Sequence, residues 1–226
     1  MRVHRFYTTT KLEKNITVTD VGFIHQWKNV FRYTAGNSIV LFGSGIECEY
    51  KITSIDKKSV ELELICQTPS LERNKEITLA ISLIKKDNLE LVLQKCTELG
   101  VTDFILLQTD RSEKKGFNRE RLEKILVEAT EQSGWGSVPT LSDIKKLNEL
   151  CANDGTNIIV LDDSGIQIKT ANINEAKSII CIGPEGGFTD GELQEARTSG
   201  AQILSFGHNT LRAETAAISI ASISSL

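Results

Sequence analysis

The spacing of apolar and polar positions differs between the first part of the chain and the rest. In the first part, apolar residues alternate with polar ones in three runs rich in β-branched side chains, at residues 37–43, 47–55 and 59–67. Such alternation, with turn-forming residues between the runs, is typical of half-buried strands. An irregular helical spacing of apolar residues precedes the runs at 22–36. The pattern predicts a small β-barrel over residues 1–70.

The rest of the chain predicts an α/β domain over residues 74–226, after a charged linker at 68–76. Short apolar runs predict strands at 77–84, 103–108, 157–162, 178–183 and 202–207. Amphipathic segments predict helices at 87–100, 118–134, 189–200 and 211–226. Asp87 and Glu90 are expected to cap the first of these helices, and Gly100 to end it. Strands alternating with helices form a mainly parallel sheet that binds ligands beyond the carboxyl ends of its strands.

Composition indicates an ordinary globular protein. Of the 226 residues, 40% are apolar and 25% are charged. The five cysteines are widely spaced and include no CxxC pair, which argues against a disulfide framework or a zinc site and for a reducing compartment. The N-terminus has no apolar signal segment, and no run approaches the roughly 20 apolar residues of a membrane span. We expect a soluble protein of the cytoplasm.

Charge is distributed unevenly. The net charge is −4, yet residues 1–70 carry nine Lys and Arg against seven Asp and Glu, so the acidic excess lies in the remainder. A mildly basic head is compatible with an RNA-contacting module, because phosphate contacts need only a local patch. A chance imbalance of surface charge explains the same numbers equally well.

The segment Ser178–Leu193, SIICIGPEGGFTDGEL, is the strongest candidate for chemistry. Its strand ends at Gly183, and after the glycines Thr189 and Glu192 form a capping box for the next helix. Glycines let the backbone reach positive φ and let a ligand approach closely. Neither phosphate-binding glycine motif is present, and Glu185 would repel a phosphate. The loop suits a ligand with a neutral ring and a cationic centre, and the alternative is a glycine-rich turn that only packs a strand onto a helix.

A second loop of the same kind follows about twenty residues later, where Gly207 precedes a helix that begins Leu-Arg-Ala-Glu-Thr-Ala. The pair resembles the SPOUT methyltransferases, and more narrowly the ribosomal RNA small-subunit methyltransferase E family, whose hallmarks IGPEGG and LRxETA stand here at Ile182–Gly187 and Leu211–Ala216. The similarity extends to residues 30–45, 52–64, 89–101, 109–112 and 128–139. This chain departs from the family at Trp135, at Asn88 and in the loop that holds His208 and Asn209.

The resemblance implies a C-terminal trefoil-knot domain with a mainly parallel sheet and an N-terminal PUA-like barrel that binds RNA. It implies methylation of uridine N3 in 16S ribosomal RNA, with S-adenosylmethionine as methyl donor and no metal. The expected partners are small-subunit ribosomal RNA or the assembled 30S subunit and a second copy of the chain, with no DNA and no membrane. Small residues along the last helix suit a knot or a tight dimer interface.

The resemblance also assigns roles to residues. Those expected to bind the methyl donor are Leu161, Ile182, Gly183, Glu185, Gly186, Gly187, Phe206, Gly207, Leu211 and Arg212. Those expected at the reacting atoms are Arg212, Glu185 and Arg111, and those expected to contact RNA are Arg2, Arg5, Lys28, Arg32 and Gln132. Glu131 is expected in the crevice of Arg111 beside Gln132. The alternatives are a surface ion pair for Arg212 and a helix cap for Glu185.

Three other functions remain open from the sequence. A related SPOUT enzyme would methylate transfer RNA or a ribose 2′-hydroxyl. A nucleotide-binding oxidoreductase would need a GxGxxG motif after an early strand, which this chain lacks. An RNA-binding protein without catalysis would keep the fold and lose the donor. Among the histidines, His208 is a candidate general base by its loop position, whereas His4 and His25 are expected to pack or to face RNA.

Overall fold

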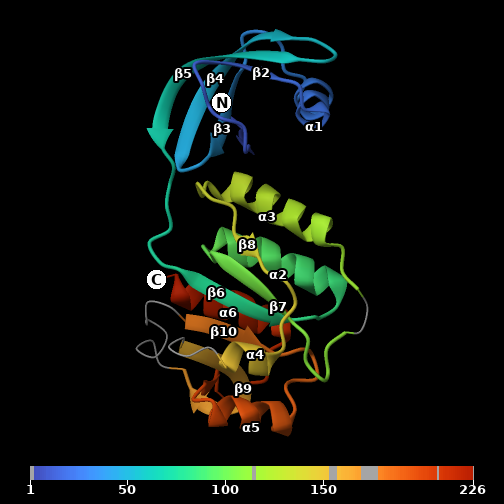
Figure 1. Cartoon of the computed structure of the whole chain (residues 1–226), viewed down its shortest axis with the longest axis vertical. Coiled ribbons are helices and arrows are strands. Elements are labelled where there is room, and N and C mark those ends of the chain that lie inside the picture. The colour runs from blue at the N-terminus through green and yellow to red at the C-terminus, as the bar shows by residue number, and fades with distance from the viewer. Residues whose placement is uncertain (1–2, 114–115, 153–156, 169–177, 208, 226) are drawn as a thin grey trace. The chain divides into compact units, whose positions relative to one another are not determined.

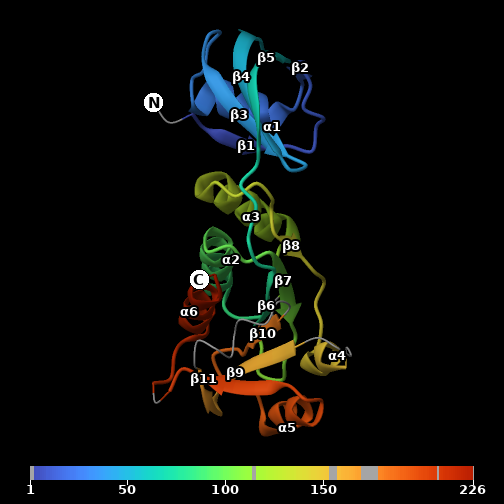
Figure 2. The same ribbon diagram turned by 90° about the vertical axis from the view of Figure 1, so that its left-hand side faces the viewer.

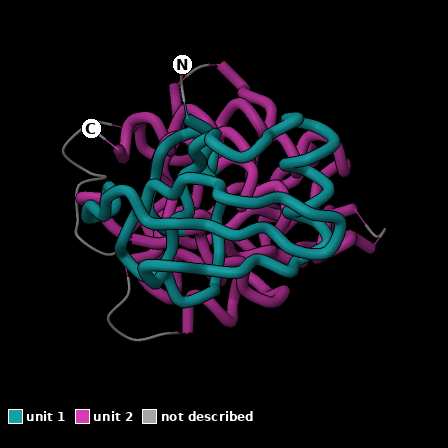
Figure 3. Tube along the Cα trace, turned by 90° about the horizontal axis from the view of Figure 1, so that it is seen from above, with its two compact units in different colours: residues 1–72, 130–137 teal, residues 73–129, 138–226 magenta. Residues whose placement is uncertain are grey.

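The computed structural model describes residues 3–113, 116–152, 157–168, 178–207 and 209–225. The chain forms two compact units (Figure 3): the first holds residues 1–72 and 130–137, and the second holds 73–129 and 138–226. The short segment 130–137 therefore groups with the head, although it lies far along the sequence. Arg2 and His208 lie outside the described residues.

The first unit is built on a five-stranded sheet in the order β1-β3-β4-β5-β2. Its strands are β1 (Arg5–Tyr7), β2 (Asn15–Val18), β3 (Ser38–Gly43), β4 (Ile46–Ile55) and β5 (Val60–Pro69). β1 pairs with β3 in parallel, and the other pairs are antiparallel. The three predicted strands are confirmed as β3, β4 and β5. β1 and β2 were not predicted, because they are too short to show alternation.

A short helical segment closes the core of this unit. Helix α1 (Val21–His25) continues into one π-helical turn, Gln26–Val30, which accounts for the irregular apolar spacing. The segment buries Trp27 completely, against Phe6 and Phe23 at ring-centroid distances of 5.4 and 5.0 Å. Aromatic contacts of this kind add to the hydrophobic gain from burial.

The second unit is an α/β domain on a six-stranded sheet in the order β11-β9-β10-β6-β7-β8. Its strands are β6 (Ile77–Ser82), β7 (Asp103–Leu107), β8 (Thr140–Leu141), β9 (Asn157–Gln167), β10 (Ser178–Ile182) and β11 (Gln202–Ser205). Every pair in this sheet is parallel, which confirms the predicted fold class. The two-residue strand β8 was missed, and β9 runs longer than predicted.

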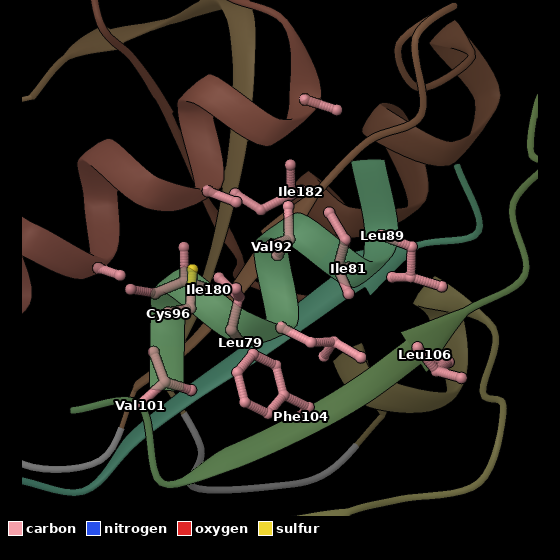
Figure 4. Packing of buried hydrophobic residues seen from close by; sticks show 14 of the residues in the cluster. Leu79, Ile81, Leu89, Val92, Cys96, Val101, Phe104, Leu106, Ile180 and Ile182 are labelled. Carbon is pink, nitrogen blue, oxygen red and sulfur yellow. The ribbon is translucent and has the colours of Figure 1, made fainter. Parts of the chain in front are cut away.

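Helices cover both faces of this sheet (Figures 1 and 2). They are α2 (Lys86–Glu98), α3 (Arg119–Ser133), α4 (Leu147–Cys151), α5 (Asp190–Thr198) and α6 (Ala213–Ser224), of which α4 was not predicted. α2, α3 and α6 contribute to the larger core, where Leu79, Ile81 and Val92 meet (Figure 4). α4 and α5 contribute to the core on the other face. None of the helices in the described ranges is long and apolar enough to cross a membrane.

Some helix ends follow the predicted local chemistry and one does not. The capping box of Thr189 and Glu192 at the start of α5 is confirmed, and Gly100 takes a φ of 96° just after α2. The predicted capping pair Asp87 and Glu90 is wrong. α2 begins earlier, at Lys86, and Glu90 instead pairs with Lys86 and with Arg121 of α3.

The turn between β10 and α5 depends on one residue with a left-handed backbone. Gly187 has a φ of 68°, and its N–H donates to the carbonyl of Pro184 at 2.9 Å. A side chain at this φ brings Cβ close to the following carbonyl. The glycine is therefore required by the turn itself, whatever else the loop does.

Replacing Gly187 by Ala should lower the free energy of unfolding by about 1–2 kcal/mol, because of this steric cost. Gly191→Ala is the matched control. Gly191 lies in the first turn of α5, where an added Cβ meets Thr189 Oγ1 at an ordinary 3.9 Å. That substitution should stabilise the protein by up to ~1 kcal/mol. Urea denaturation measures both, and equal shifts of the two variants in one direction would contradict this account.

The cysteines differ in access. Cys48, Cys66, Cys96, Cys151 and Cys181 are free, and all except Cys66 are buried. Burial raises the pKa of the Cys96 thiol to about 12, and burial also raises the pKa of the Cys181 thiol. Since the thiolate is the reactive form, these two side chains behave as small apolar residues.

We predict that one thiol per chain reacts rapidly with Ellman's reagent in the folded protein and that five react in denaturant. Cys66→Ser should abolish the rapid phase and leave four thiols titratable after unfolding. Rapid reaction of a second thiol in the native state would show that a cysteine described here as buried is accessible.

Candidate functional site

Two neighbouring strands bring predicted donor-binding residues side by side. Ile182 at the end of β10 is in register with Leu161 of β9 on one side and with Ile81 of β6 on the other. The side chains of Leu161 and Ile182 are only 9% and 2% exposed and belong to the core (Figure 4 labels Ile182). These side chains therefore form part of the core and do not make an open apolar wall for a ligand.

Each glycine of the following loop has a local structural reason. A Cβ on Gly183 would lie 3.1 Å from the ring of Phe188, and a Cβ on Gly186 would lie 3.3 Å from the side chain of Arg111. A Cβ on Gly187 would meet no heavy atom within 4 Å, so that position faces open space. The turn requires its glycines for packing and for positive φ, and it also leaves room beside the backbone for a ligand.

Arg111 holds this loop from the turn after β7, and β6 lies between β7 and β10 in the sheet. It stands in the turn Thr109–Ser112, where Ser112 Oγ accepts from the Thr109 N–H at 2.9 Å. One Arg111 guanidinium nitrogen donates to the carbonyl of Gly186 at 2.7 Å and to that of Phe188 at 3.2 Å. A charged donor makes a stronger hydrogen bond than a neutral one. The Arg111 expected at the reacting atoms is thus a residue that holds the loop backbone.

Glu185 is exposed on the same loop and touches the start of another helix. Its carboxylate accepts from the backbone N–H of Lys85 at 3.3 Å, at the N-cap position of α2. The capping alternative for Glu185 therefore has support, although the helix it serves is α2 and not the helix that follows it. The bond is long, and the exposed carboxylate keeps acceptor capacity for a ligand.

At the start of α6, Arg212 and Glu214 differ sharply in exposure. The Arg212 side chain is 84% exposed and lies 3.9 Å from Glu214, so their ion pair is weak. The Glu214 side chain is 12% exposed and accepts from Asn88 Nδ2 of α2 at 3.4 Å. Asn88, where this chain departs from the family pattern, therefore joins α2 to α6. Glu214 was missed as a candidate, although the quoted LRAETA motif contains it.

The second glycine loop is tied to the end of β9. Gly207 has a φ of 106°, and an added Cβ would lie 3.1 Å from Gln167 Nε2. The Ile168 N–H donates to the carbonyl of Ser205, and the hydroxyl of Thr210 donates to Asp163 at 2.8 Å. In the same loop, the partly buried Phe206 packs against the larger core. The loop before Leu211 is thus held near the end of the strand that carries Leu161.

The residues predicted to bind RNA have diverse surroundings in the head. Arg5 is 13% exposed, donates to Glu47 at 2.7 Å and lies over the ring of Phe42. It also donates to the backbone carbonyls of Thr130 and Trp135, so it anchors the segment 130–137 to the head. In that segment Glu131 accepts from the Tyr7 N–H at 2.9 Å. Arg5 and Glu131 therefore both have hydrogen-bond partners within the head.

The remaining RNA candidates are more accessible. Arg32 and Gln132 are exposed and Lys28 is half-buried, and their contact with RNA stays a prediction. Arg32 has a φ of 56°, which is uncommon for a residue with a side chain. His4 packs on Phe31 and bonds the Tyr33 hydroxyl, so it has the packing role expected of it.

Within the described ranges, no three His, Cys, Asp or Glu side chains are grouped so that they could hold a metal ion. The charged groups of the site are instead Arg111, Glu185 and Arg212, each on a different loop or helix start.

Comparison with known proteins places this chain among RNA-modifying enzymes. Residues 71–225 match the family described as RNA methyltransferase domain, and residues 28–65 match the RNA methyltransferase PUA domain. A relative in Rickettsia conorii, ribosomal RNA small subunit methyltransferase E, is 33% identical over 96% of this chain and 93% of its own length.

Two solved structures are similar over nearly the whole chain. The ribosomal RNA small subunit methyltransferase E of Neisseria gonorrhoeae, bound to S-adenosyl methionine, has a TM-score of 0.88 and 28% identity, and the match covers 98% of this chain and 96% of that one. A methyltransferase of Legionella pneumophila, also with bound cofactor, has a TM-score of 0.88 and 26% identity over 99% of this chain and 97% of that one. The chain therefore belongs to the ribosomal RNA small subunit methyltransferase E family.

Proposed function

We propose that this protein transfers the methyl group of S-adenosylmethionine to N3 of a uridine in small-subunit ribosomal RNA. The observation that carries the proposal is the loop Gly183–Phe188, held by Arg111 at the carboxyl edge of the sheet, in a chain of this family. The donor and the ribosomal RNA follow from what the names of the relatives state, and the uridine N3 target follows from the motif resemblance.

The residues at this edge fit such a donor. Open space lies beside Gly187, where an ordinary residue would place its Cβ, and Leu161 and Ile182 are register partners on adjacent strands, where we expect the adenine ring to lie. Most of a bound nucleoside's specificity can come from a few well-placed polar groups of this kind. The exposed carboxylate of Glu185 matches the positive charge of a sulfonium.

The reaction needs positioning more than acid–base power. The bound donor supplies an electrophilic methyl group on a positively charged sulfur, the N3–methyl bond forms as the sulfur–methyl bond breaks, and the N3 proton leaves to a base or to water. Holding both reactants in line converts a bimolecular step into an effectively unimolecular one. In this chain Arg111 performs that task indirectly, because it fixes the carbonyls of Gly186 and Phe188.

Arg212 is the cation best placed to stabilise charge on the substrate. Its side chain is 84% exposed at the start of α6, and its pairing with Glu214 at 3.9 Å leaves it able to turn toward a ligand. Negative charge develops on the uracil O2 and O4 oxygens as N3 loses its proton, and a nearby guanidinium stabilises such charge. We place Arg212 at those oxygens or at the nucleotide's phosphate.

The head completes the proposal as an RNA-binding module. Lys28 and Arg32 are the predicted RNA-contacting cations that the structure describes there besides Arg5, and Arg5 bonds to the segment 130–137. A homodimer, with small-subunit RNA or the assembled subunit as substrate in the cytoplasm, is part of the proposal. The small residues Ala217 and Ala221 of α6 permit close helix packing, although both are already buried within the chain.

The direct test uses methyl-labelled donor and small ribosomal subunits that lack the modification. We expect label on N3 of one uridine, located by nuclease digestion and mass spectrometry, and no incorporation into subunits that already carry the modification. Label on a ribose hydroxyl or on transfer RNA would contradict the proposed target. Failure of S-adenosylhomocysteine to bind would contradict the proposed donor.

A second prediction concerns the role of Arg111. Arg111→Ala should weaken the affinity for S-adenosylhomocysteine by about tenfold or more, because it removes two charge-assisted hydrogen bonds that hold the loop. Titration calorimetry measures the affinity, and circular dichroism verifies folding. Arg119→Ala is the matched control, since Arg119 also donates to a backbone carbonyl, that of Leu141. Equal affinity in Arg111→Ala and in the wild-type protein would remove Arg111 from this role.

A further inference from the structure

A cavity of about 420 Å³ lies beside the candidate site and has no place in the account above. It opens between the end of β6, the first turn of α2 and the segment that leads into α3. The volume is within the ~300–1,000 Å³ usual for sites that take a small molecule or a part of a larger one. All of its lining residues belong to the second unit.

The floor of the cavity is apolar and includes an aromatic ring. Leu83, Ile84, Leu89 and Leu122 are each at most 5% exposed, and the half-buried Phe117 packs against the same core. A flat base with apolar faces can lie on such a floor, and stacking on an aromatic side chain tolerates any of the bases. Among these floor residues, Phe117 is the one whose side chain stays partly exposed to the cavity.

The rim of the cavity is cationic. Lys85 and Lys86 are exposed at the start of α2, and Arg121 stands on the first turn of α3. Glu90 accepts from Arg121 at 3.1 Å and lies 3.8 Å from Lys86, so it orients Arg121 and pairs only weakly with Lys86. Lys85 has no recorded side-chain partner in the part of the chain that the structure describes.

Two helix N-termini add to this positive potential. α2 begins at Lys86, and α3 begins at Arg119 with the Asn118 side chain accepting from the Arg121 N–H at 3.0 Å. Both starts belong to the wall of the cavity. The N-terminus of a helix carries partial positive charge that favours a phosphate nearby.

The cavity is linked physically to the proposed donor loop. Lys85, on the rim, donates its backbone N–H to Glu185 at 3.3 Å. Glu113, on the opposite wall, donates its backbone N–H to the carbonyl of Leu83 at 2.8 Å, and its half-buried carboxylate can accept from a base N–H. A ligand in the cavity would therefore lie beside the loop that contains Glu185.

We propose that this cavity binds one unstacked nucleotide of the RNA substrate, with the base on the Phe117 floor and the phosphate at Lys85, Lys86 and Arg121. The inference rests on the proposed function and names the place where the RNA enters the second unit. Enzymes that modify a base must take nucleotides out of the stack, and a pocket for an extruded base lowers the cost of doing so.

The test measures RNA binding and donor binding separately in the full chain. The probe is a fluorescein-labelled fragment of small-subunit ribosomal RNA, titrated by anisotropy in the presence of S-adenosylhomocysteine at several salt concentrations. Lys85→Gln keeps the backbone N–H that donates a hydrogen bond to the Glu185 carboxylate. It should weaken RNA binding by roughly threefold to tenfold and reduce the magnitude of the salt slope by about 0.7, as expected for one lost phosphate contact on a single strand.

Two further variants complete the design. Phe117→Leu keeps an apolar floor without the aromatic ring, and it should weaken RNA binding at every salt concentration without changing the slope. Lys124→Gln is the matched control, because Lys124 lies on α3 outside the cavity and pairs only weakly with Glu128 at 3.8 Å. It should bind RNA as the wild-type protein does.

The outcomes separate this inference from the proposed function. If Lys85→Gln and Phe117→Leu bind RNA with the wild-type affinity and slope while S-adenosylhomocysteine binds normally, the cavity inference is overturned and the proposed function stands. If the two variants lose affinity for S-adenosylhomocysteine instead, the cavity belongs to the donor and the inference is also overturned. If the wild-type protein binds no S-adenosylhomocysteine, the proposed function fails first.

Discussion

The site depends on two hydrogen bonds, which the Arg111 guanidinium donates to the carbonyls of Gly186 and Phe188. It crosses from the turn after β7 to the loop after β10, and β6 lies between those two strands. The loop is also fixed by the turn bond from Gly187 to Pro184 and by the capping box at Thr189. Because Arg111 satisfies two carbonyls at once, the loop presents its remaining groups in one conformation, which positioning catalysis requires.

Much of the fold could be predicted from the sequence because its signals are local. The alternation in β4 and β5 and the capping box at Thr189 each depend on residues only a few positions apart. The predicted cap of α2 failed because Glu90 is recruited by Arg121, which lies 31 residues away. Short elements such as β8 were missed because two residues carry no periodicity.

The loops of the candidate site could be picked out from the sequence, but the contacts of their side chains could not. Motif resemblance pointed to Arg111, and the structure adds that its partners are backbone carbonyls 75 positions or more along the chain. It also predicted an RNA contact for Arg5, and the structure adds that this side chain is 13% exposed and bonded to Glu47. Such partners depend on tertiary contact, which neither spacing nor composition reveals.

A crystal structure of the protein with S-adenosylhomocysteine tests the central claim most directly. The account predicts the adenosine beside the backbone of Leu161, Ile182 and Gly207, the sulfur facing the Gly183–Phe188 loop, and Arg111 still bonded to its two carbonyls. A ligand found only in the cavity between α2 and α3, or a loop that binds the ligand after Arg111 has released it, would contradict the account.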